Sequence, residues 1–149
     1  MSANVSGAAG ASANERRAWR VLGVHHVAFA SDSDDVTASL ASLLGLTCTH
    51  REDAPGFVEE MIPVGGVSLQ VLQVTGPGTV ADFLARRGPG LHHVALRVDD
   101  VDAVTADLCA RGVEMVDRIP RPGGAATRIA FAHPRAFGGL LVEFVQDPS

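Results

Sequence analysis

The sequence is poor in cysteine and contains no long uninterrupted apolar stretch. Cys48 and Cys109 are the two cysteines among 149 residues, too few for a disulfide framework and without the spacing of a metal site. We therefore expect two small buried thiols and a reducing compartment. No apolar run approaches the roughly 18 residues of a membrane span, and the first residues carry no apolar secretory segment. These features predict a cytoplasmic protein with no membrane partner.

Positive charge is also scarce. Asp and Glu outnumber Lys and Arg by 17 to 12, and the net charge of −5 argues against a nucleic-acid partner. Apolar residues make up 46% of the chain, as in a folded globular protein. Residues 1–20 are rich in Ala, Ser, Gly and Asn and have no apolar period, so we predict a disordered tail there and a single domain over residues 21–149.

An internal repeat organises that domain. The tetrapeptide His-His-Val-Ala occupies residues 25–28 and again residues 92–95. Each copy is followed by an acidic cluster and then by a helix-like segment that ends in glycine, at Gly45 and at Gly112, and the spacing is the same in both copies. A repeat of this kind predicts two similar modules paired in one domain, at about residues 21–74 and 90–147.

Each module is predicted to run strand, helix and then three strands, from hydrophobic periodicity and turn residues. The strands of the first module are expected at residues 21–30, 47–51, 57–64 and 67–72, and its helix follows an acidic turn at residues 31–35. Those of the second are expected at residues 91–98, 114–119, 127–132 and 140–145. The fold class is therefore α+β, with tandem βαβββ modules that form one curved mixed sheet around a metal-binding cleft.

Alternation along the first strand of each module separates its two histidines. Successive strand residues face opposite ways, so we expect only one histidine of each pair to enter the shared cleft. His26 and His93 stand on the faces that also carry small alanines, and we predict that they point into the cleft. His25 and His92 are predicted to face the core.

The last strand of each module adds one oxygen donor opposite an apolar face. Two imidazoles, one amide oxygen and one carboxylate suit a divalent first-row metal and leave coordination positions open. The predicted ligands are His26, Gln70, His93 and Glu143. His50 and His133 have no such partners and are expected to be loop or structural histidines.

These features resemble the vicinal-oxygen-chelate superfamily (the glyoxalase and bleomycin-resistance proteins) and, more narrowly, the methylmalonyl-CoA epimerase family. The likeness covers about residues 22–147, and its motifs lie at residues 82–87, 90–96, 98–103, 128–134 and 139–143. In that family the residues matching the four predicted ligands hold the metal. The resemblance implies a divalent cofactor (Co, Mn, Zn, Ni or Mg), an acyl-CoA substrate and a homodimer.

The resemblance also assigns roles to two carboxylates. The family's Gly-x-Val-Glu-x-Met pattern falls on residues 56–61 and selects Glu59, whereas alternation alone leaves Glu59 and Glu60 both open. The implied enzyme is an isomerase that interconverts (R)- and (S)-methylmalonyl-CoA by metal-assisted 1,1-proton transfer through an enolate. Glu59 and Glu143 would exchange protons with opposite faces of the substrate.

Two rival functions use the same residues. One is another metal-dependent enzyme of the superfamily, a glyoxalase or an extradiol dioxygenase, because His26, His93 and Glu143 could form a two-His, one-carboxylate iron site. The other is a non-catalytic ligand-binding relative. A fourth ligand at Gln70 and a second carboxylate at Glu59 favour proton transfer.

Overall fold

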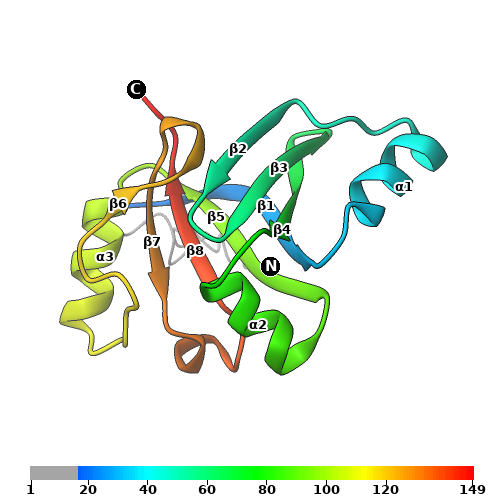
Figure 1. Ribbon diagram of the computed structural model, residues 1–149. Helices are drawn as coiled ribbons and strands as arrows, with labels where there is room; N and C mark the ends of the chain where they lie inside the picture. The colour runs from blue at the N-terminus through cyan, green and yellow to red at the C-terminus, as the bar shows by residue number, and fades with distance from the viewer. Residues whose placement is uncertain (1–16) are drawn as a thin grey trace, which may run out of the picture.

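The computed structural model describes residues 17–149, and Figure 1 shows a curled sheet with helices around it. The first module comprises β1 (Val21–Ser31), α1 (Asp35–Leu44), β2 (His50–Ala54), β3 (Phe57–Val64) and β4 (Val67–Val74). A connecting helix, α2 (Thr79–Arg87), leads to the second module. That module comprises β5 (Gly90–Val98), α3 (Val101–Ala110), β6 (Arg121–Pro122), β7 (Arg128–Ala132) and β8 (Val142–Gln146).

All eight strands belong to one mixed sheet, in the order β2-β3-β4-β1-β5-β8-β7-β6. The two first strands, β1 and β5, pair antiparallel at its centre. Each of them also pairs in parallel with the last strand of its own module, β1 with β4 and β5 with β8. The two halves of the sheet therefore repeat one another about its midline, and the predicted α+β class and curved mixed sheet are confirmed.

The β1–β5 pairing contains a β-bulge at each histidine pair. His25 is the extra residue on β1 and His92 is the extra residue on β5, since the opposing strand has no partner for either position. A bulge turns side chains away from strict alternation. The prediction that only one histidine of each pair enters the cleft is therefore wrong, because all four line the same pocket.

Two of the three α-helices in residues 17–149 bury an apolar face. Helix α3 packs Val104 and Leu108 into the core formed with β7 and β8. Helix α2 packs Val80 and Phe83 against small residues of β1 and against Leu72 of β4. Because Val80 also lines the pocket, α2 closes one end of it. Helix α1 has no buried residue and stands away from the sheet in Figure 1.

The chain departs from the prediction at the edge of the second module. The expected strand at residues 114–119 is reduced to one bridge between Met115 and Ala132. The next two N–H groups, of Val116 and Asp117, both donate to the carbonyl of Phe131, so the strand ladder does not continue. The outermost strand is instead the two-residue β6, which lies between the strands expected at residues 114–119 and 127–132.

The end of the predicted tail also differs from expectation. Residues 1–16 of the predicted 1–20 tail lie outside the described residues. Trp19 is 4% exposed, and its indole N–H donates to Asp107 on α3 at 3.0 Å. The backbone N–H of Arg20 donates to Asp99 at 2.7 Å. Trp19 therefore belongs to the core of the second module, and Arg20 is attached to the surface of that module.

Two expectations drawn from composition can be compared with residues 17–149. Cys48 and Cys109 are both free and partly buried, so they form no disulfide. No helix in this part of the chain has the length and apolar character needed to cross a bilayer.

Candidate metal centre and acid–base site

The candidate site lies in a cleft of about 570 Å³ lined by residues of both modules. That volume is in the range of small-molecule sites. The floor is formed by the central strands, and the walls are formed by β2, β3, α2 and the loop between β6 and β7. Residues of β1, β4, β5 and β8 therefore reach the same space from two halves of the sheet.

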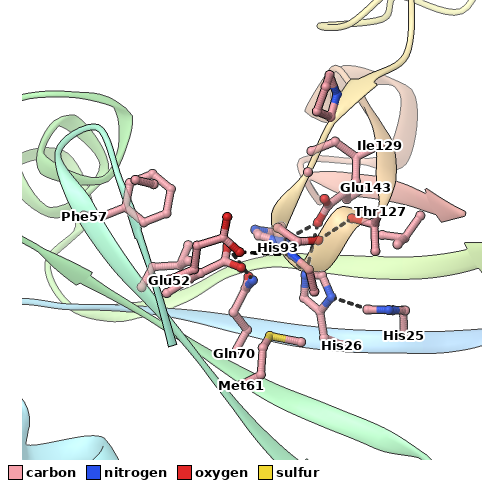
Figure 2. Close-up of a pocket in the computed structure, with 18 of the residues that line it drawn as sticks. His25, His26, Glu52, Phe57, Met61, Gln70, His93, Thr127, Ile129 and Glu143 are labelled. Atoms are coloured by element: carbon pink, nitrogen blue, oxygen red, sulfur yellow. Dashed lines mark hydrogen bonds and ion pairs between the residues drawn. The ribbon is translucent and has the colours of Figure 1, made fainter. Parts of the chain in front are cut away.

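Three of the predicted ligands converge at the cleft floor. The Nε2 atoms of His26 and His93 lie 3.1 Å and 2.9 Å from Oε2 of Glu143, and they lie 3.0 Å from each other. All three residues are at least 95% buried, and their candidate ligand atoms all lie within 4.8 Å of one another. Figure 2 shows the two imidazoles and the carboxylate meeting at this point.

Sheet register explains this convergence. Glu143 on β8 is paired with Ala95 on β5, and Gln70 on β4 is paired with Ala28 on β1. Each alanine follows the ligand histidine of its strand by two residues, and both alanines are fully buried. A small side chain at these two positions leaves room over the strand for the histidine and for the oxygen donor beside it.

The buried Glu143 carboxylate is held in its ionised form. Burial by itself would raise its pKa, but hydrogen bonds from the two imidazoles and their charges lower the pKa to about 2. An ionised, buried carboxylate beside two imidazole nitrogens has the chemistry of a divalent-cation ligand.

Gln70 supplies the orphan polar atom of the site. Its amide Nε2 donates to Oε2 of Glu59 at 3.3 Å, which leaves its carbonyl Oε1 as the buried side-chain polar atom without a hydrogen-bond partner among the described residues. Buried polar atoms are nearly always satisfied. An unpaired amide oxygen lining the same pocket as the three convergent ligands fits a bound cation, so the donor set is compatible with the predicted metal.

Glu59 and Glu60 lie on opposite faces of β3. Glu59 lines the cleft, and its pKa is raised by burial and by the negative charges of Glu52 and Glu143. Glu60 is buried on the other side, where its carboxylate lies 3.3 Å from Arg51 and accepts a hydrogen bond from Thr37 on α1. Of the two carboxylates that alternation left open, Glu59 is the one exposed to the cleft.

Two polar residues on β2 were missed from the sequence. His50, expected to be a loop or structural histidine, lies 3.0 Å from Glu52 through Nε2. With Glu59 they form a second group of clustered candidate ligand atoms. Their spacing of two residues on one strand would have placed them on one face, had the strand been predicted at residues 50–54. His133 is a turn residue as expected, and it caps a short helix by accepting from the N–H of Arg135.

The loop between β6 and β7 leans over Glu59. A Cβ added to Gly124 would lie 1.9 Å from Oε1 of Glu59, so a larger residue here would displace the Glu59 carboxylate. The next two residues, Ala125 and Ala126, both have left-handed backbone conformations, and the N–H of Ala125 donates to Glu52 at 3.0 Å. This loop thus joins the second module to the cleft wall of the first.

Comparison with known families agrees with the fold and the site. The model of the Glyoxalase/Bleomycin resistance protein/Dioxygenase superfamily matches residues 25–131. The chain belongs to this superfamily. Its curled eight-stranded sheet is the vicinal-oxygen-chelate fold.

The similar proteins with assigned activities include epimerases. The ethylmalonyl-CoA/methylmalonyl-CoA epimerase of Cereibacter sphaeroides is 29% identical over 129 residues, which cover 83% of this chain and 96% of the relative. The crystal structure of methylmalonyl-CoA epimerase from Mycobacterium tuberculosis is 33% identical with a TM-score of 0.80, and the match covers 87% of this chain and 90% of that one. A methylmalonyl-CoA epimerase in complex with methylmalonyl-CoA and NH4+ is 30% identical with a TM-score of 0.82, over 87% and 96% of the two chains. These likenesses indicate an epimerase, an enzyme of the isomerase class.

Proposed function

We propose that this protein interconverts (R)- and (S)-methylmalonyl-CoA by moving a proton at the α-carbon. The observation that carries the proposal is the pairing of two carboxylates from different modules in one cleft. Glu59 reaches the cleft from β3, and Glu143 reaches it from β8 beside two histidines. Relatives named as methylmalonyl-CoA epimerases support this substrate.

The environments of the two carboxylates suit opposite tasks. Inversion at an α-carbon needs a base on one face and an acid on the other. The pKa of Glu143 is depressed and that of Glu59 is raised, so Glu59 takes up a proton more readily than Glu143 does. In one direction Glu143 removes the α-proton, and Glu59 delivers its own proton to the other face. The reverse reaction exchanges these roles, as a pair with separated pKa values can do.

The residues that would hold a divalent ion are His26, Gln70, His93 and Glu143. A bound ion (Co, Mn, Zn, Ni or Mg) would supply Lewis-acid stabilisation of the negative charge that develops on the thioester oxygen. The chain itself supplies the two carboxylates, and it shields Glu143 from bulk water by burying it.

The unpaired Oε1 of Gln70 favours an epimerase over a dioxygenase. A two-His, one-carboxylate iron site would use His26, His93 and Glu143 and would leave this buried amide oxygen and Glu59 without a role. The test is to give the metal-loaded protein (S)-methylmalonyl-CoA and follow formation of the (R) epimer together with oxygen consumption. We expect epimerisation without oxygen uptake. Oxygen uptake with a catechol, glyoxalase turnover of a hemithioacetal, or substrate binding without turnover would each contradict the proposal in favour of a rival function.

We also propose that the working form is a homodimer. Helix α1 carries an apolar face of Val36, Leu40, Leu43 and Leu44 that its own sheet does not cover. Leu43 is 78% exposed and Leu44 is 67% exposed, and a second copy of the chain would remove this surface from water. Light scattering is expected to give the mass of a dimer, and Leu43→Asp together with Leu44→Asp is expected to give a monomer. A monomeric wild-type protein at micromolar concentration would contradict this.

The proposed location is the cytoplasm. It rests on two unpaired cysteines, which a reducing compartment keeps in the thiol form. Fractionation of the source cells with an antibody against the chain would test it, and recovery in an oxidising compartment would contradict it.

A further inference from the structure

Each predicted ligand histidine has a second histidine beside it, placed there by a β-bulge. Nδ1 of His25 lies 2.7 Å from Nδ1 of His26, and Nδ1 of His92 lies 2.8 Å from Nδ1 of His93. Figure 2 shows the His25 contact reaching the His26 ring on a different edge from the one that faces Glu143. The Nδ1 atom of each ligand ring is therefore occupied by a neighbour, and its Nε2 atom faces the cleft.

The direction of these hydrogen bonds follows from what a ligand histidine must do. A neutral imidazole carries one proton, so a ring that offers the Nε2 lone pair to a metal must keep its proton on Nδ1. The Nδ1–H of His26 can then donate only if Nδ1 of His25 is unprotonated. That condition places the proton of His25 on its own Nε2.

A carboxylate lies where that proton points. Nε2 of His25 lies 3.2 Å from Oδ1 of Asp147, near the C-terminus of the chain. Asp147 in turn accepts a hydrogen bond from Nε of Arg97 at 2.7 Å through its other oxygen. A donor thus faces an acceptor at every step of a row of four residues, which runs from Arg97 through Asp147 and His25 to His26.

We propose that His25 and Asp147 are positioning residues that hold His26 in the tautomer protonated on Nδ1 when its Nε2 exchanges the hydrogen bond to Glu143 for a divalent ion. The inference rests on the metal site of the proposed function and adds the chain of contacts that orients one of its ligands. Outer partners of this kind affect metal affinity without touching the metal.

The second module orients its ligand histidine differently. His92 stands against the ring of Phe83, with ring centroids 4.8 Å apart, and no carboxylate in residues 17–149 lies within hydrogen-bond distance of it. His92 is therefore held in place by ring packing on α2, whereas His25 is held by a hydrogen bond to Asp147. We therefore expect that removing the Asp147 carboxylate weakens metal binding by His26, and that His93 does not depend on such a carboxylate.

The test measures zinc affinity of the metal-stripped full-length protein by competition with a chromogenic chelator. His25→Phe keeps a ring but removes the acceptor, and we expect its affinity to fall by about 10- to 100-fold. Asp147→Ala is expected to lower affinity by several-fold. His25→Asn retains an acceptor oxygen and should recover most of the loss. His133→Phe, at a turn outside the cleft, serves as the matched control and should bind as the wild type does.

Ring-nitrogen chemical shifts of the zinc-loaded protein give a second readout that does not depend on affinity. We expect the proton of His26 on Nδ1 in the wild type. Wild-type affinity in both His25→Phe and Asp147→Ala, or a proton on Nε2 of His26, would overturn the inference while the proposed function stood. Failure of the wild type to bind any divalent ion would overturn the proposed metal site as well. Asp147 is about half exposed, so its alanine variant keeps the test decisive if His25→Phe does not fold.

Discussion

The two modules share their inner strands and differ in what surrounds them. β1 and β4 repeat the arrangement of β5 and β8, and each pair brings one histidine and one oxygen donor to the cleft floor. The helices of the two modules differ, because α3 buries its apolar face whereas α1 buries none of its residues. The strands that carry the site are therefore repeated in both modules, whereas the packing of the helices is not.

A second difference lies on the strands next to these pairs. Met61 on β3 is paired with Gln70, and Phe131 on β7 is paired with Glu143. Two residues earlier, the first module has Glu59 and the second has Ile129. Both line the cleft, so the duplicated frame carries an acid–base group on one side and an apolar wall on the other.

The largest effect is expected from removing that unmatched carboxylate. Glu59→Gln should lower deuterium exchange into the α-position of methylmalonyl-CoA by about 10²- to 10⁴-fold, because positioned proton transfer is lost. Glu60→Gln, on the far face of β3, should leave exchange within about twofold of wild type. If Glu60→Gln were the inactive variant, the assignment of the base would be reversed.

The packing of the two module helices can be compared with one truncation in each. Leu108 on α3 is 7% exposed, so Leu108→Ala should lower the free energy of unfolding by about 2–5 kcal/mol. Leu43→Ala on α1 should change it by less than about 0.5 kcal/mol in dilute protein, since the side chain is mostly in water. Denaturant unfolding measures both, and equal losses would show that α1 is packed in solution.

The position of the Glu59 carboxylate against the loop of the second module can be changed by a substitution at Gly124. A methyl group there would push the Glu59 carboxylate aside, and a displacement of about 1 Å can lower a reaction rate by up to about 100-fold. We expect Gly124→Ala to reduce exchange accordingly while the bound zinc remains. Gly66→Ala, in a turn with open space around it, is the control. Full exchange activity in Gly124→Ala would mean that the loop does not position Glu59.

The smallest effect is a gain in stability. Because the folded-state pKa of Glu59 is raised above its ordinary value near 4.5, the ionised side chain destabilises the fold at neutral pH. Glu59→Gln should therefore raise Tm at pH 7, by up to about 3 °C in the metal-stripped protein. The gain should disappear as pH falls through the folded-state pKa, where the wild-type carboxyl becomes neutral. A gain independent of pH would point to packing instead of charge.

Much of this site could be predicted from the sequence because the same pattern of residues occurs in both modules. His26 and His93 occupy the same place in two copies, and alternation on the last strands led to Gln70 and Glu143. What alternation could not foresee were the bulges, which depend on how β1 and β5 pair across the sheet and which bring His25 and His92 into the cleft. The loop over Glu59 was also hidden, because two left-handed alanines give no local signal.

The same reasoning explains the errors at the periphery. Residues 114–119 carry apolar residues typical of a strand, but the carbonyl of Phe131 accepts from two successive N–H groups, and only the folded chain reveals that arrangement. Trp19 was assigned to the tail because the stretch before it is rich in small and polar residues and has no apolar period. Its burial comes from contacts with α3, about 88 residues away in the chain.

Metal stoichiometry tests most directly whether both modules serve one ion. Elemental analysis of the protein after loading and desalting should give one divalent ion per chain in the wild type. Either His26→Ala, in the first module, or His93→Ala, in the second, should abolish it. One ion retained by each of these variants with its affinity unchanged would contradict a site shared between the modules.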